Sequence, residues 1–429
     1  MNRERITWLV GGAMLSFLVL RVPGSLAQRD DDYRFVRTLV DIYRQVDTNY
    51  VENVDQPKLQ TAAINGMLAT LDPYTVYVPS DMQEEFNNSL DGNFKGVGIR
   101  LSQDPPDNGP IKVVTPIDDS PAWNAGVLPG DVLTAVDGKS ILGKKLEEII
   151  PTIQGPAGTK VTLTLQRDKG QTLDITMTRQ EFVVPQVKGL SRNPDNSWNF
   201  WADEDKKIAY IRLNQFTPDI GEQITKISND LLKQGMKGMI FDLRFNPGGR
   251  LEEAETLIDL FLKEGTIVSI KGRNRPEQKV LAKAEGTLPD FPMTVLVNEH
   301  SASASEVMAG SLKDNKRAIV VGARTYGKGS VQEVMPLDAN SGELKITVAY
   351  WYLPSGKRVA RLKDAKEWGV EPDINVPMND EAQAKLIMEE TRAESKRVPN
   401  PATAPSTTPT TQPIDPQFDA ALDAVRKKI

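Results

Sequence analysis

Cysteine is absent from this 429-residue chain, and histidine occurs only once, at His300. The lack of cysteine excludes disulfides, thiolate metal sites and a cysteine nucleophile. A single histidine also argues against a metal centre with several histidine ligands. The formal net charge is only −6, whereas nucleic-acid-binding proteins usually carry a basic surface. We therefore expect neither a metal ion nor nucleic acid as a ligand.

The apolar run at the N-terminus is short, with fifteen mostly apolar residues at positions 6–20. Arginines flank it, and Ser25 and Ala27 supply the small residues of a cleavage site. This pattern predicts a secretory signal over residues 1–27. The alternative is an uncleaved membrane anchor, but fifteen helical residues fall short of a hydrocarbon core of about 30 Å. In both cases we expect the rest of the chain to be exported.

The length of the chain predicts two or three domains. Its content of 39% hydrophobic and 26% charged residues is typical of globular proteins with ordinary hydrophobic cores. Residues 33–92 repeat apolar positions at spacings of three and four, which predicts an N-terminal helical domain. Residues 93–184 contain short strands separated by Gly, Pro and Asp turns, with one amphipathic helix near residues 144–155. They predict a β-rich domain.

Residues 185–396 alternate apolar strands with amphipathic helices. This alternation predicts βαβ units and an α/β core with a partly parallel sheet. Residues 397–416 are rich in Pro, Thr and Ala and poor in large apolar side chains, so they predict a disordered linker. Residues 417–429 predict a short C-terminal helix.

Two glycines precede a predicted strand in the segment Gly96-Val97-Gly98-Ile99. Glycines at such a place allow successive amides to converge on a carboxylate, and the strand that follows can pair with an extended peptide. For a single Gly-x-Gly, a simple bend is the commoner interpretation. The tight turn in Ala125–Asp131 completes a pattern that resembles a PDZ domain over about ninety residues. The resemblance implies recognition of the C-terminal residues of another polypeptide.

The segment HSASASE, residues 300–306, lies between an apolar strand and an amphipathic helix. A serine at this junction presents its hydroxyl where helix amides lack partners, which suits either a nucleophile or an ordinary N-cap. Any Ser–His arrangement must use His300, which is only three residues from Ser303 and has no evident partner. Lys328 is the other candidate base. It lies between two glycines, and burial could lower its pKa toward neutrality.

The segments VLVNEHSASASEVMAGSLKDN and VVGARTYGKGSVQ resemble the C-terminal processing, or tail-specific, serine peptidases. DLRFNPGG at 242–249, LDPYTVYV and the PDZ-like region belong to the same pattern, which covers nearly all of residues 35–376. The resemblance implies a crotonase- or ClpP-like βαβ core, with a PDZ domain at 93–184 inserted between it and the helical domain. It also implies a periplasmic or cell-envelope enzyme that needs no cofactor.

The resemblance assigns a role to each matching residue. It implies that Ser303 is the nucleophile, that Lys328 is the general base and that Gln332 orients the lysine. The oxyanion hole maps to the amides of Gly249, or of Gly248, and Ala304.

Asp314 also matches a family position, but eleven residues of helix span about 16 Å. It is therefore expected to support the structure rather than touch the nucleophile. His300 departs from the family pattern, which commonly has a small residue there.

The expected partners are protein or peptide substrates with accessible C-termini, and relatives also use adaptors or form oligomers. One alternative is a catalytically inactive peptide-binding scaffold, which the joint retention of Ser303, Lys328 and Gln332 disfavours. The other is an acyl-CoA enzyme on the related crotonase-type core, which the peptide-binding domain disfavours.

Overall fold

The computed structural model describes residues 23–387 and 415–429, except 104, 106–108, 118–119, 168–169, 196, 339–340, 363–364, 380 and 384. Most of the predicted signal (1–27) and of the predicted linker (397–416) lies outside these residues. The chain forms two compact units, residues 1–79 and 80–429. Among the described residues, no helix is both long and apolar enough to cross a membrane.

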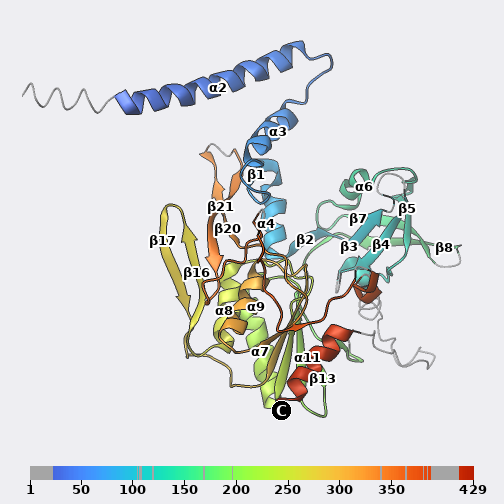
Figure 1. Cartoon of the computed structure of the whole chain (residues 1–429). Coiled ribbons are helices and arrows are strands. Elements are labelled where there is room, and N and C mark those ends of the chain that lie inside the picture. The colour runs from blue at the N-terminus through green and yellow to red at the C-terminus, as the bar shows by residue number, and fades with distance from the viewer. Residues whose placement is uncertain are drawn as a thin grey trace, which may run out of the picture. The chain divides into compact units, whose positions relative to one another are not determined.

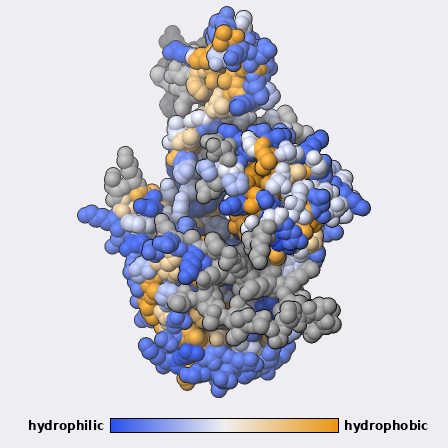
Figure 2. All heavy atoms as spheres, turned by 90° about the vertical axis from the view of Figure 1, so that its right-hand side faces the viewer, coloured by the Kyte–Doolittle hydropathy of each residue, from blue (hydrophilic) through white to orange (hydrophobic). Residues whose placement is uncertain are grey.

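The first unit is helical, as its periodicity predicts. α2 spans Pro23–Asn49 and α3 spans Gln56–Leu68, and the short strand β1 follows at Val76–Val78. Asp55 starts α3 by accepting a hydrogen bond from the amide of Lys58, which is the usual role of an aspartate at an N-cap. α2 exposes several apolar side chains: Tyr33, Phe35, Val36, Leu39, Val40 and Ile42. Hydrophobic residues also form orange patches on the face that Figure 2 shows.

The second unit begins with a β-rich region. After η1 (Ser80–Met82) and α4 (Gln83–Asp91), the strands are β2 (Asn93–Gly96), β3 (Ile99–Gln103), β4 (Ile111–Pro116), β5 (Val132–Val136), β6 (Lys139–Ser140), β7 (Lys160–Arg167), β8 (Gln171–Thr178) and β9 (Gln180–Val183). β3, β4, β5, β7 and β8 form one sheet in that order, and β2 pairs separately with β9. The helices are α5 (Pro121–Asn124) and α6 (Leu146–Ile153). The segment 94–101, which reads as one strand in the sequence, therefore contains the end of β2 and the start of β3.

The α/β core contains a mixed sheet. β10 (Val187–Lys188) and β13 (Trp201–Asp203) pair antiparallel with β14 (Ile208–Leu213). From β14 the sheet continues through the parallel strands β15 (Gly238–Asp242), β18 (Met293–Val297), β19 (Ile319–Gly322) and β22 (Ile374–Asn375). The short strands β11 (Ser191–Arg192) and β12 (Trp198–Asn199) form a separate pair. The partly parallel sheet was predicted, because buried parallel strands are apolar on both faces.

Helices cover both faces of this sheet (Figure 1). Alternate residues of a strand point to opposite faces. Ala209, Ile211 and Leu213 accordingly pack in the cluster with α7 (Ile220–Lys233), α8 (Leu251–Phe261) and α9 (Ala304–Asp314). Ile208 and Tyr210 pack instead against α11 (Pro416–Arg426).

Two hairpins form a second sheet that the sequence interpretation missed. β16 (Thr266–Gly272) pairs with β17 (Arg275–Leu281), and β20 (Ser330–Pro336) pairs with β21 (Glu343–Tyr352). β16 also pairs with β21, which joins the hairpins (Figure 1). The Lys328 turn leads directly into β20, so this sheet borders the candidate site.

Candidate active site

Ser303 occupies a strained turn between β18 and α9. It is the N-cap residue of α9 and has φ 57° and ψ −119°. An ordinary N-cap residue adopts extended backbone, and a positive φ at a non-glycine residue costs about 1–3 kcal/mol. Strain of this kind is found at nucleophilic serines that a sharp strand-to-helix turn presents at a helix start.

The other two serines of the segment have structural roles. The hydroxyl of Ser301 donates to the carbonyl oxygen of Leu243 at 2.8 Å, and that of Ser305 donates to the carbonyl oxygen of Asn246 at 3.0 Å. Both serines are fully buried, whereas Ser303 is partly exposed. Only the middle serine can therefore meet a substrate.

Glu306, in the first turn of α9, ties the serine turn to the lysine turn. Its Oε2 accepts hydrogen bonds from the amides of Ser303 at 2.9 Å and Lys328 at 2.8 Å. Its Oε1 accepts from the Thr325 hydroxyl at 2.5 Å and the Gly327 amide at 2.7 Å. Because one oxygen atom binds both amides, the backbones of Ser303 and Lys328 lie within a few ångströms of each other.

Burial raises the pKa of Glu306 to about 6, although its four hydrogen bonds oppose the shift. The sequence interpretation did not include Glu306. The spacing Ser303-x-x-Glu306 is a capping-box signature and could have indicated its contact with Ser303. Its contact with the lysine turn, about twenty residues away, has no local signal.

Lys328 is half-buried, and burial is the main reason that its pKa falls to about 8. The positive charge of Lys345 lowers the pKa further, and the carboxylate of Glu306 opposes the change. A lysine with a pKa of about 8 is partly neutral near physiological pH, as a general base requires.

The glycines beside Lys328 allow a neighbouring segment to approach. A Cβ on Gly329 would lie 2.4 Å from the amide nitrogen of Ala360, and one on Gly327 would lie 2.8 Å from the Cβ of Arg361. The amide of Arg361 also donates to the carbonyl oxygen of Gly327 at 2.8 Å. The segment 360–361 therefore covers the lysine turn and contributes to its burial.

Gln332 lies in β20. Its amide nitrogen donates to the hydroxyl of Ser330 at 2.7 Å and to that of Thr347 at 3.3 Å. Among the described residues, Gln332 makes no hydrogen bond to Lys328. The side chain is thus held on one face of the β20–β21 hairpin, with its carbonyl oxygen left as an acceptor.

The loop of residues 246–249 packs against the serine turn. A Cβ on Gly248 would lie 2.7 Å from the Cβ of Ser303 and 3.0 Å from the amide nitrogen of Ala304. The amide of Gly248 donates to Asn246 Oδ1 at 2.8 Å and is already used. In the part of the chain that the structure describes, the amides of Gly249 and Ala304 donate to no acceptor. The bonding therefore favours Gly249 over Gly248 as an oxyanion donor.

His300 and Asp314 lie outside this arrangement. The exposed ring of His300 stacks on Phe245, with 5.4 Å between ring centres. Asp314 lies at the far end of α9 from Ser303 and accepts a hydrogen bond from the amide of Ser355 at 2.9 Å. The contact of Asp314 with Ser355, at the end of α9 away from Ser303, is a structural one.

The predicted peptide-binding segment lies at the start of an edge strand. β3 pairs only with β4 among the described strands, so its other edge is open. The carbonyl oxygens of Val97 and Gly98 accept from the amides of Ala122 and Ile117. Their own amides donate to no acceptor among the described residues. Two free amides beside an open strand edge can bind a peptide that ends in a carboxylate.

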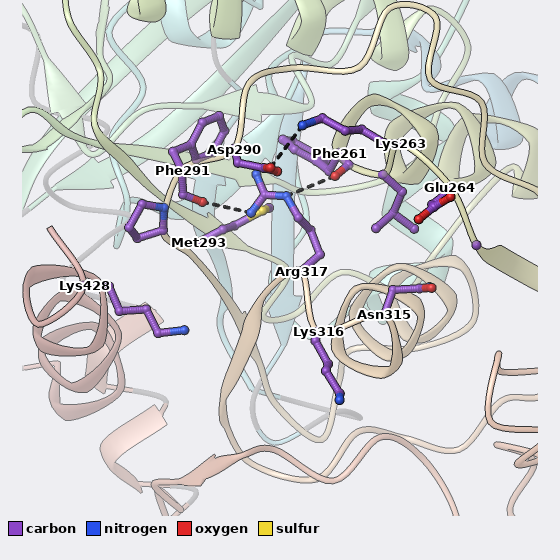
Figure 3. A pocket seen from close by; sticks show the side chains of 13 residues that line it. Phe261, Lys263, Glu264, Asp290, Phe291, Met293, Asn315, Lys316, Arg317 and Lys428 are labelled. Atoms are coloured by element: carbon purple, nitrogen blue, oxygen red, sulfur yellow. Dashed lines mark hydrogen bonds and ion pairs between the residues drawn. The ribbon is translucent and has the colours of Figure 1, made fainter.

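A cavity of about 1000 Å³ lies away from this site. Asn315, Lys316 and Arg317, which follow α9, help to line it, so it lies at the opposite end of that helix from Ser303. Figure 3 shows Arg317 donating to the carbonyl oxygens of Phe261 and Phe291. None of the predicted site residues lines this cavity. The described residues also contain no group of three or more His, Asp or Glu side chains that could hold a metal ion.

Comparisons with known proteins show the family of the chain. Residues 207–376 match the model of peptidase family S41, residues 112–167 match a PDZ domain, and residues 23–82 match the activating protease CtpB N-terminal domain. The carboxy-terminal-processing protease of Bartonella bacilliformis is 38% identical over 381 residues, which cover 87% of this chain and 82% of the relative. The chain belongs to the carboxy-terminal processing peptidases of family S41.

Another S41 relative, the carboxy-terminal processing protease CtpA of Bacillus subtilis, is 31% identical over 89% of this chain and 78% of its own. The crystal structure of a putative S41 protease from Bacteroides fragilis matches with a TM-score of 0.52 and 16% identity, over 74% of this chain and 82% of that one. These findings confirm the predicted fold class, an S41-type α/β core with a PDZ domain and an N-terminal helical region. They also confirm that the chain is a peptidase, which argues against the acyl-CoA alternative.

Proposed function

We propose that Ser303 and Lys328 form the catalytic dyad of an exported C-terminal processing peptidase. The observation that carries this proposal is the shared carboxylate oxygen of Glu306, which holds the serine turn and the lysine turn together. The partial exposure of Ser303 and the pKa of about 8 for Lys328 support the same roles.

In this mechanism neutral Lys328 accepts the proton of the Ser303 hydroxyl as the serine oxygen attacks the scissile carbonyl carbon. The tetrahedral intermediate then expels the amine, which takes the proton from Lys328, and an acyl-enzyme remains. A water molecule next attacks the ester carbonyl and gives a proton to Lys328. Collapse of the second intermediate releases the new carboxyl terminus and returns the proton to Ser303.

The unused amides of Gly249 and Ala304 support a role as the oxyanion hole. The amide of Ala304 also lies at the N-terminus of α9, where the helix dipole favours negative charge. Removal of one such donor typically costs about 2.7–4 kcal/mol of transition-state stabilisation. We assign Gln332 to the orientation of Lys328, through the carbonyl oxygen that its two hydrogen bonds leave available.

The PDZ domain would capture the substrate. We propose that the amides of Val97 and Gly98 bind the terminal carboxylate and that the substrate chain pairs with the open edge of β3. α6 contacts β3, so the added strand would lie beside this helix. The substrates would be proteins with accessible C-termini, and the predicted N-terminal signal would place the enzyme in the cell envelope or periplasm.

The test is degradation of an unfolded protein with an apolar C-terminus by purified enzyme. Ser303→Ala should abolish product formation, because no nucleophile remains. Ser355→Ala changes an exposed serine of the same core and should retain wild-type activity. Equal product from the wild type and Ser303→Ala would end the proposal. No product from the wild type on a panel of such substrates would instead favour the inactive peptide-binding scaffold.

A further inference from the structure

Lys345 lies on the face of the β20–β21 hairpin that carries Gln332. Lys345 is opposite Val334 of β20, and Thr347 is opposite Gln332. Residues two apart in a strand point to the same face. The hydrogen bond from Gln332 to Thr347, at 3.3 Å, shows that these side chains meet on that face. Lys345 therefore lies on the hairpin face that carries Ser330 and Gln332, the residues of β20 that follow the Lys328 turn.

The surroundings of Lys345 are unusual for a cation. Its side chain is half-buried, and its Nζ lies 5.7 Å from the centre of the Phe86 ring of α4. Among the described residues it forms no ion pair, even with Glu343 two positions earlier in the same strand. Burial of a charge without a carboxylate partner costs stability. The Phe86 ring gives the amine a favourable cation–π contact but supplies no opposite charge.

In the described part of the chain, the charges of Glu306 and Lys345 both shift the pKa of Lys328, in addition to the effect of its burial. Glu306 approaches from α9 and stabilises the protonated amine, whereas Lys345 acts from β21 and repels it. Burial lowers the pKa of Lys345 itself. Of these two neighbours, only Lys345 favours the neutral amine that a general base needs.

We propose that Lys345 is a positioning residue whose positive charge drives the proton from Lys328 and so sets the pH range of the enzyme. This role rests on the proposed function of Lys328 as the general base. It assigns Lys345 no contact with the substrate and no proton of the reaction.

The experiment measures kcat/KM against pH, with a short peptide substrate, for the wild type, Lys345→Met and Lys345→Arg. Loss of the positive charge in Lys345→Met stabilises protonated Lys328. The acidic limb of the pH profile, where kcat/KM rises with pH, should therefore move to higher pH by roughly half a unit or more. Activity near pH 7 should then fall about threefold or more, while the plateau at high pH stays close to that of the wild type. Lys345→Arg keeps the charge and should keep the wild-type limb.

Lys279→Met provides a matched control, because Lys279 is an exposed lysine of the same sheet, and it should leave the profile unchanged. Lys345→Gln repeats the test with a polar side chain, in case the methionine variant does not fold. An acidic limb that stays in place in a folded Lys345→Met or Lys345→Gln enzyme would overturn this proposal alone. Activity that survives Ser303→Ala would show instead that the proposed function is wrong.

Discussion

At the residue scale, the proposed mechanism requires a neutral Lys328. Its pKa of about 8 lies above neutrality, so the inactive, protonated form predominates at pH 7. The kcat/KM of the wild type should therefore rise with pH through a midpoint near 8 and then level off. A pH–rate profile with a short peptide substrate measures this midpoint. A flat profile between pH 6 and 9 would contradict the role of Lys328.

Glu306 provides the second prediction at this scale. In Glu306→Gln an NH₂ group replaces one carboxylate oxygen. The donors that this oxygen bound then have no acceptor, and the loss destabilises the folded site by about 1–3 kcal/mol. We expect kcat to fall roughly tenfold or more, because the serine and lysine turns are no longer held together.

The loss of the negative charge should also move the acidic limb to lower pH, since Glu306 raises the pKa of Lys328. This direction is opposite to the one expected for Lys345→Met. Glu264→Gln, at an exposed position, is the control. An unchanged kcat in a folded Glu306→Gln enzyme would refute the positioning role.

Local sequence signals explain which site residues could be predicted. Ser303 and Lys328 lie in short segments that resemble those of the tail-specific peptidases, and this resemblance singled them out. Lys345 could not be predicted in the same way, because its place beside β20 depends on the antiparallel pairing of β20 with β21. No local pattern encodes which strands of a chain pair with each other.

At the element scale, the buried strands β14, β15, β18 and β19 were predicted because they read as continuous apolar runs. The missed strand β17 has six of its seven residues exposed and no apolar alternation. Its position depends on pairing with β16 rather than on a buried face. This kind of strand is difficult to recognise from hydrophobic periodicity.

The proposed binding of a carboxylate by the PDZ segment makes a prediction at this scale. Gly98 has φ +73°, and an added Cβ would lie 2.2 Å from the Cβ of Ser120. Gly98→Ala should therefore distort the loop and weaken the binding of a peptide with a free C-terminal carboxylate by about tenfold. Gly138→Ala is a matched control, because Gly138 has a similar φ of +74° but nothing within 4 Å of an added Cβ.

Titration of a fluorescent C-terminal peptide into the Ser303→Ala enzyme measures this affinity. The same peptide with an amidated C-terminus should bind weakly to the Ser303→Ala enzyme that keeps Gly98, since the amidated peptide lacks the carboxylate. Equal affinities of the acid and the amide would disprove carboxylate recognition by this segment.

At the scale of the whole molecule, the C-terminal helix is joined to the strand that leads into the oxyanion loop. Arg244 is 2% exposed and forms ion pairs with Asp242 at 2.6 Å and with Asp415 at 2.8 Å. Asp415 is also the N-cap of α11. Gly249 lies five positions after Arg244 in the chain, so α11 and the candidate oxyanion hole share one buried anchor.

Asp415→Ala removes both the cap and one partner of a buried ion pair. Arg244 keeps its ion pair with Asp242, so we expect a cost of about 1–3 kcal/mol from the lost cap and the lost charged hydrogen bond. The free energy of unfolding should fall by a similar amount, and kcat should fall as the oxyanion loop loosens. Asp423→Ala, at an exposed position of the same helix, should change neither quantity, as chemical denaturation and peptide hydrolysis can show. Wild-type stability in Asp415→Ala would contradict the anchoring role.

The most direct measurement for the account is the site of acylation. The enzyme is mixed with an activated peptide ester, quenched with acid within the first turnover and mapped by mass spectrometry. We predict the mass of the acyl group on the oxygen of Ser303, with much less adduct in Lys328→Ala at the same time. An acyl group on another residue, or turnover without any acyl-enzyme in the wild type, would contradict the account.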